Sequence, residues 1–242
     1  MLRIFRPIPV ESLKLLVFDL DGTLIDSAQD LCNSVNAMLK HCSLPPLDDK
    51  QIASYIGDGV LMLVKRALAA ENGLDADEKL LNEAYEFFLS YYREHKLDFT
   101  YAYGGVIEAL KAIGAGPEGR KRAMAVLTNK PVRPARAICE ALGLAPYFMN
   151  IYGGNSFATK KPDPQGMLAL MAEAGAKPEE TVLIGDSQVD VQTARNAGAW
   201  SIGCTFGLAP LTLETAQPDI LVDSPLDWTE ALSEKSKAVL EP

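Results

Sequence analysis

Six short apolar segments separated by helical patterns constrain the fold of this chain most strongly. They cover residues 14–20, 123–128, 150–153, 181–185, 199–205 and 219–222. Runs of this length and composition are typical of parallel strands that are buried on both faces. Three of the helical stretches between them, 134–142, 164–174 and 189–197, end at Gly143, Gly175 and Gly198, and glycine is the residue that most often closes a helix. We therefore predict an α/β fold with a doubly wound parallel sheet and a Rossmann-like core.

The segment 28–100 interrupts this alternation of strands and helices. It contains no convincing strand pattern, and it carries helical periods at 31–39, 60–70 and 77–92. We predict a small all-helical domain at 28–100, inserted after the first strand, and an α/β core made of 1–27 and 101–242. Because the insert leaves and returns near one end of the first strand, it could act as a lid over a site there. The alternative is a surface decoration.

The charge and cysteine content exclude several classes of protein. The formal net charge is -9 over 242 residues, which argues against nucleic acid as a partner because phosphate backbones require a basic face. No run of about 18 apolar residues is present, so we expect no membrane-spanning helix. The four cysteines are scattered without a C-x-x-C pair, which favours reduced thiols and a cytoplasmic location.

The polar residues that could carry chemistry follow the carboxyl ends of the predicted strands, where open α/β sheets bind their ligands. They are Asp19, Asp21, Thr128, Asn129, Lys161, Asp186 and Asp190. Carboxylates favour Mg²⁺, a lysine and a metal together neutralise a phosphoryl group, and a carboxylate can act as a nucleophile. Because the only two histidines, His41 and His95, lie in the insert, we expect neither a histidine nucleophile nor a zinc site.

Four motifs support phosphoryl transfer more specifically. They are FDLDGTLIDS at 18–27, LTNK at 127–130, KKPDP at 160–164 and GDSQVD at 185–190. In this order and spacing they resemble the motifs of the haloacid dehalogenase-like phosphatase superfamily, and the resemblance extends from about residue 14 to residue 223. A single D-x-D would be weak, whereas four ordered motifs are highly specific.

The resemblance implies a role for each motif residue. Asp19 would be the nucleophile, and Asp21 would be the general acid and then the general base. Lys161 would steady Asp19 and the transferring charge. Asp186 would bind Mg²⁺ together with Asp19 and the backbone carbonyl of Asp21, and Asp190 would be a metal ligand or would brace the ligands from behind.

The resemblance also implies roles near the phosphoryl group and in the insert. Thr128 and Asn129 would hold phosphoryl oxygens. The insert segment YIGDGVLMLVKRAL at 55–68 is similar to the cap loop of the phosphoglycolate phosphatase family. Gly57 and Gly59 would let the loop backbone approach the substrate. Arg66 would pair with a substrate carboxylate, although a solvated helix face explains it equally well.

Asp21 separates the branches of the superfamily, because its dehalogenases lack this second aspartate. Phosphonatases use a cap lysine, for which Lys65 is a formal candidate without further support. The expected reaction is hydrolysis of a small phosphorylated metabolite, best matched by 2-phosphoglycolate, in a monomer or homodimer. A sugar phosphomutase or a pyrophosphatase is the alternative, and a non-catalytic binding protein fits least. Asp26 and Ser27 are expected to cap the first insert helix, and Lys160 to be a surface lysine.

Overall fold

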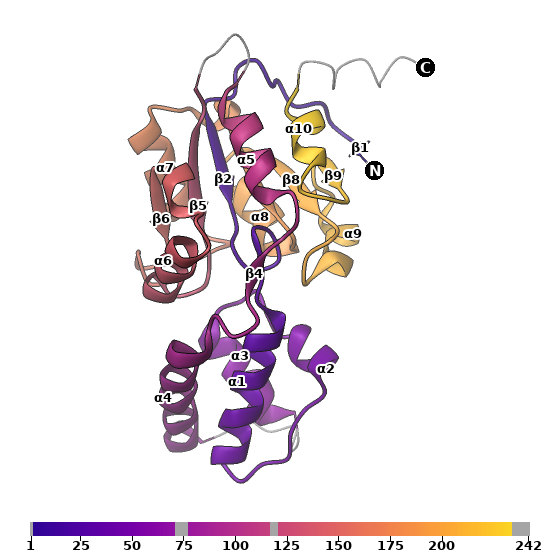
Figure 1. The fold of residues 1–242 in the computed structure, drawn as a ribbon. Coiled ribbons are helices and arrows are strands. Elements are labelled where there is room, and N and C mark those ends of the chain that lie inside the picture. The colour runs from indigo at the N-terminus through magenta and orange to yellow at the C-terminus, as the bar shows by residue number, and fades with distance from the viewer. Residues whose placement is uncertain (1, 71–76, 117–120, 234–242) are drawn as a thin grey trace.

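A mainly parallel sheet forms the centre of the larger domain (Figure 1). The structure is a computed structural model that describes residues 2–70, 77–116 and 121–233. The sheet has the order β1-β9-β8-β7-β2-β5-β6. Its parallel strands are β2 (Leu15–Phe18), β5 (Ala123–Leu127), β6 (Asn150–Tyr152), β7 (Thr181–Gly185), β8 (Trp200–Cys204) and β9 (Ile220–Val222). All six predicted strands are confirmed, to within two residues at each end. The short β1 (Arg3–Ile4) pairs antiparallel with β9 and was not predicted.

Helices cover both faces of this sheet. Successive residues of β2 point to opposite faces, so Leu16 and Phe18 join one apolar cluster while Leu15 and Val17 join another. The first cluster lies under α5 (Val106–Gly114), α6 (Val132–Ala141) and α10 (Asp227–Ala231), and the second lies under α7 (Gln165–Ala174) and α8 (Gln188–Asn196). The connections after β5, β6 and β8 each contain a single 3₁₀ turn, and the last of them also contains the short α9 (Leu213–Ala216). Doubly wound burial explains why β2 reads as a continuous apolar run.

The predicted helical insert is present as a bundle beside the sheet domain (Figure 1). It consists of α1 (Ala28–His41), α2 (Asp49–Ala53), α3 (Val60–Ala69) and α4 (Glu78–His95). It has an apolar core of its own, centred on Val35, Met38 and Phe88, all fully buried. Two short antiparallel strands, β3 (Ile25–Asp26) and β4 (Tyr101–Ala102), lead the chain into and out of the bundle. We propose domain boundaries at 27/28 and 100/101, and we call the insert the cap.

Local signals account for the ends of several elements. Gly143, Gly175 and Gly198 have φ angles of 70°, 60° and 71°, which is the left-handed conformation that the predicted helix ends require.

In the parts of the chain that the structure describes, no helix is long and apolar enough to cross a membrane.

Candidate active site

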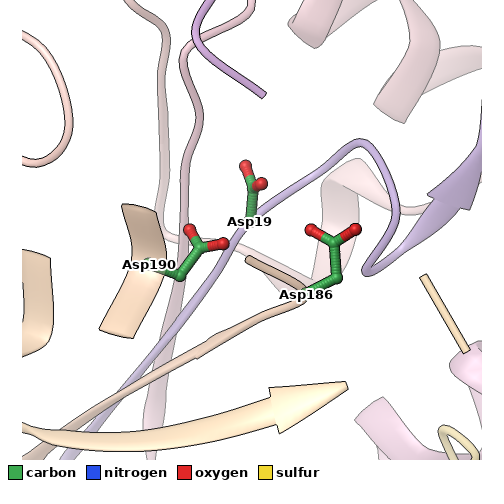
Figure 2. A group of neighbouring side chains, drawn as sticks. All are labelled: Asp19, Asp186 and Asp190. Carbon is green, nitrogen blue, oxygen red and sulfur yellow. The ribbon is translucent and has the colours of Figure 1, made fainter. Parts of the chain in front are cut away.

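Three carboxylates converge at the carboxyl end of the sheet (Figure 2). Asp19 follows β2, Asp186 follows the neighbouring strand β7, and Asp190 lies in the first turn of α8. One oxygen from each carboxylate lies within 4.8 Å of the others, and all three residues are buried. The sheet order explains this convergence, because the central strand β2 pairs with β7 along its whole length. Like charges so close together favour a nearby cation or the uptake of a proton.

Lys161 supplies one positive charge to this cluster. Its Nζ lies 2.9 Å from Asp19 Oδ1 and 2.6 Å from Asp190 Oδ1, and its side chain is 2% exposed. Burial lowers the pKa of Lys161, but the charges of Asp19 and Asp190 outweigh it, so the pKa is raised overall. For Asp19 the balance is reversed, because burial outweighs Lys161 and raises the pKa to about 6. One ammonium group therefore faces three carboxylates.

The remaining charge imbalance fits a divalent cation. Burial, followed by the charges of Asp190 and Asp19, raises the pKa of Asp186 well above its ordinary value. Asp19 Oδ1 is buried and, despite the nearby ammonium group, accepts no hydrogen bond of good geometry from the described residues. The ligand set consists of hard oxygens, which Mg²⁺ prefers. The cluster could therefore hold a metal ion.

Asp190 has a second, structural task. Its Oδ2 accepts hydrogen bonds from the backbone N–H and the hydroxyl of Ser187, in a capping box that begins α8. Its Oδ1 accepts a hydrogen bond from Lys161. Bracing of the helix and contact with Lys161 are thus combined in one side chain. Direct coordination of a metal by Asp190 stays a prediction.

Asp21 lies outside this cluster and has different partners. Its Oδ1 accepts a hydrogen bond from Ser27 Oγ at 2.5 Å, and both of its oxygens accept from Lys130 Nζ, at 2.8 and 3.0 Å. Ser27 occupies the N-cap position of α1 as expected, but its hydroxyl makes no capping hydrogen bond because it donates to Asp21. The side chain of Asp26 accepts from the N–H of Ala28. Sequence analysis assigned no role to Lys130, although the residue stands within the LTNK motif.

A small cavity lies between these side chains and the cap. Its volume is about 40 Å³, and it is lined by core residues Asp19, Asp21, Thr128, Asn129 and Lys130 and by cap residues Leu31, Ile56, Gly57, Gly59, Val60 and Leu63. The structure thus brings both proposed phosphate-binding residues and both cap glycines to the space above Asp19. The cap side of the cavity is mainly apolar, as a site that excludes water requires.

The cap loop is joined to the core by two hydrogen bonds to its backbone. Asn129 Nδ2 donates to the carbonyl of Gly57 at 3.0 Å and also to that of Lys161 at 3.1 Å. Lys160, expected as a surface lysine, is exposed but donates from Nζ to the carbonyl of Asp58. These contacts hold the glycine loop over the carboxylates.

Arg66 does not line the cavity. Its Nη2 pairs with Asp58 at 2.5 Å, and its Nη1 donates to the carbonyl of Tyr55 at 3.0 Å. The guanidinium therefore supports the cap loop from within the cap. Contact between Arg66 and a substrate carboxylate stays a prediction.

Comparisons with known proteins agree on one family. The model of the haloacid dehalogenase-like hydrolases matches residues 16–204. A phosphoglycolate phosphatase of Chromobacterium violaceum is 40% identical over 215 residues, covering 89% of this chain and 94% of the relative. A phosphoglycolate phosphatase of Agrobacterium fabrum is 36% identical, with 91% and 93% covered. A crystal structure described as a predicted phosphoglycolate phosphatase from Haemophilus somnus superposes with a TM-score of 0.85 at 31% identity, over 92% of this chain and 99% of that one.

Proposed function

This chain belongs to the haloacid dehalogenase-like hydrolases, and on that premise we propose that it is a Mg²⁺-dependent phosphatase that converts 2-phosphoglycolate to glycolate and phosphate. The observation that carries the reaction type is the buried group of Asp19, Asp186 and Asp190 around Lys161. The substrate follows from relatives that bear this name and match about nine-tenths of the chain.

In the first step the carboxylate of Asp19 attacks the phosphorus atom. A bond forms between the Asp19 oxygen and phosphorus, and the bond between phosphorus and the glycolate oxygen breaks. The electron pair of that bond stays on the glycolate oxygen, which takes a proton from the carboxyl group of Asp21. Glycolate then leaves, and Asp19 carries the phosphoryl group as an aspartyl-phosphate.

In the second step a water molecule attacks the same phosphorus atom. Asp21, now a carboxylate, takes the proton of this water, and the bond between phosphorus and Asp19 breaks. Phosphate leaves, while Asp19 is again a carboxylate and Asp21 is again protonated. Throughout, Lys161 lies beside the attacking oxygen. We assign the hydroxyl of Thr128 and the backbone N–H of Asn129 as donors to phosphoryl oxygens, because both protons of Asn129 Nδ2 already bond the carbonyls of Gly57 and Lys161.

We assign the metal to Asp19, Asp186 and the backbone carbonyl of Asp21, with Asp190 beside them. When bound, Mg²⁺ would supply positive charge that offsets the negative charge of the phosphoryl oxygens. The raised pKa of Asp186 and the buried oxygen of Asp19 support this assignment. We further propose that the enzyme works in the cytoplasm, as a monomer or homodimer, since its four cysteines are unpaired thiols.

Phosphate release from a panel of phosphate esters, with and without Mg²⁺, tests the proposal. The panel contains 2-phosphoglycolate, pyrophosphate, β-glucose 1-phosphate and p-nitrophenyl phosphate, and Asp19→Asn is the control. We expect the highest kcat/KM for 2-phosphoglycolate, no release without Mg²⁺, and none from the variant. Preference for another ester would leave the proposed mechanism standing and would refute 2-phosphoglycolate as the substrate. Absence of Mg²⁺-dependent release from every compound would refute the phosphatase, and isomerisation of the sugar phosphate would indicate a mutase.

A further inference from the structure

Lys130 is a buried cation at the active site to which the mechanism above gives no task. Its side chain is 3% exposed, and its Nζ contacts both oxygens of Asp21, whose side chain is 13% exposed. Among the described residues, Asp21 is the carboxylate with which Lys130 forms an ion pair. Because an unpaired buried ammonium group is costly, each member of this pair restricts where the other can lie.

The backbone of Lys130 is held firmly beside the phosphate-binding residues. Its N–H donates to Thr128 Oγ1 at 3.2 Å, and its carbonyl accepts from the N–H of Gly154 at 2.9 Å. The chain at Gly153 approaches so closely that a Cβ there would lie 2.5 Å from the Lys130 carbonyl oxygen. The ammonium group is therefore built on the same fixed loop as the residues that face the phosphoryl group.

The cap covers Lys130 from the other side. Nζ lies 4.8 Å from the centre of the Tyr92 ring, a geometry in which a cation is attracted to the aromatic face. Tyr92 belongs to α4 of the cap and is 3% exposed. The ammonium group thus lies between Asp21 of the core and an aromatic ring of the cap, and it is largely buried.

We propose that Lys130 is a positioning residue for Asp21. By binding both carboxylate oxygens it fixes the direction in which Asp21 faces the leaving oxygen. Tyr92 covers this pair from the cap side. The inference rests on the proposed function, because it needs Asp21 to act as the general acid.

A role through Asp21 predicts that the effect of Lys130 depends on the leaving group. Glycolate leaves as an alkoxide and needs a proton, whereas p-nitrophenolate is stable enough to leave without one. The parameter kcat/KM reports the steps up to aspartyl-phosphate formation. General acid catalysis is typically worth about 10²–10⁴-fold. We expect Lys130→Met to lower kcat/KM by about 10²-fold for 2-phosphoglycolate and by less than about threefold for p-nitrophenyl phosphate.

A double-mutant cycle makes the test independent of the second substrate. In an Asp21→Asn background, Lys130→Met should lower kcat/KM for 2-phosphoglycolate by less than about threefold further, because residues that act through one another are not additive. Lys130→Arg should recover part of the loss. Lys160→Met is the matched control, since Lys160 contacts the cap loop and not Asp21, and it should change both substrates alike. Thermal unfolding checks the fold of each variant, and Lys130→Gln replaces the methionine variant if that one does not fold.

The outcomes separate this inference from the proposed function. Equal losses for the two substrates, or full additivity in the cycle, would overturn the role of Lys130 while the wild-type enzyme remained a phosphatase. A wild-type protein that releases no phosphate from any ester would overturn both. A leaving-group-dependent loss that disappears in the Asp21→Asn background supports both.

Discussion

Removal of the Lys161 ammonium group should destabilise the metal-free protein by a measurable amount. Lys161 is the cation that the described structure pairs with the Asp19, Asp186 and Asp190 cluster. Loss of one partner from a buried ion pair typically costs about 3–5 kcal/mol. Asp19, whose pKa is already about 6 beside Lys161, can take up a proton and relieve part of this cost. We therefore expect about 3 kcal/mol for Lys161→Met at pH 7.

This free energy converts to a clear change in Tm. For chains of 150–250 residues, 1 kcal/mol corresponds to about 2–4 °C, so Lys161→Met should lower Tm by about 6–12 °C in the presence of a chelator. Lys160→Met is the control, because it removes the neighbouring ammonium group from an exposed position. It should shift Tm by no more than about 2 °C, since surface substitutions usually change stability by less than about 0.5 kcal/mol. Mg²⁺ should raise Tm more in Lys161→Met than in the wild type, since it would face the carboxylates without a competing cation.

The Tm difference between Lys161→Met and the wild type should change with pH in a defined direction. Burial raises the pKa of Asp19 in the folded state from 3.8 to about 6. The stability that protonation confers is therefore fully present below about pH 3.8 and is lost as the pH rises through about 6. Without Lys161 this loss should move to higher pH and become larger, so the Tm difference between variant and wild type should grow from pH 5 to pH 8. A difference of less than about 2 °C at pH 7, or one that grows as the pH falls, would refute this account.

Three further predictions follow from the geometry. Gly22 has a φ of +82°, and a Cβ there would lie 2.1 Å from Asp186 Oδ2. Gly22→Ala should therefore displace that carboxylate and lower kcat by about 10²-fold, in a protein that circular dichroism shows to be folded. An unchanged kcat would show that Asp186 can move freely. Because protons compete with Mg²⁺ for Asp19, the apparent Mg²⁺ affinity measured by calorimetry should fall as the pH drops below about 6, and a pH-independent affinity would remove Asp19 from the ligands. Burial raises the pKa of three thiols strongly, to about 11 for Cys32, to about 12 for Cys139 and well above its ordinary value for Cys204. DTNB at pH 8 should therefore react rapidly only with the half-buried Cys42 in the folded protein and with all four thiols after unfolding. Rapid reaction of more than one thiol in the folded protein would contradict the burial.

Much of the fold could be predicted because its signals are local. Apolar runs buried on both faces identified all six parallel strands, and glycines at helix ends identified three helix boundaries. The unpredicted elements lack such signals. The strand β1 has only two residues, and its partners lie more than 200 residues away, as in the pairing of Ile4 with Ile220. The helix α5 follows Gly105, which the sequence does not distinguish from a loop glycine.

The candidate site was predicted less evenly than the fold. The motif spacing places Asp19 and Asp186 at strand ends, and the structure brings them together because β2 and β7 are parallel neighbours. Lys161 reaches them from the loop that follows β6, a strand separated from β2 by β5. Arg66 could not be judged from the sequence. Both a substrate contact and an exposed helix face are compatible with its helical position, whereas the structure pairs it with Asp58.

The sequence by itself determined the inventory of this protein: six buried strands, a helical insert, and carboxylates and a lysine at the strand ends. Periodicity and motif spacing are patterns along the sequence, so they can be recognised without knowing how the chain packs. Only the tertiary structure decided which charges meet. Asp21 faces Lys130 across 109 positions of sequence, and Asn129 holds Gly57 across 72, so these pairs depend on strand order and on how the cap packs against the core.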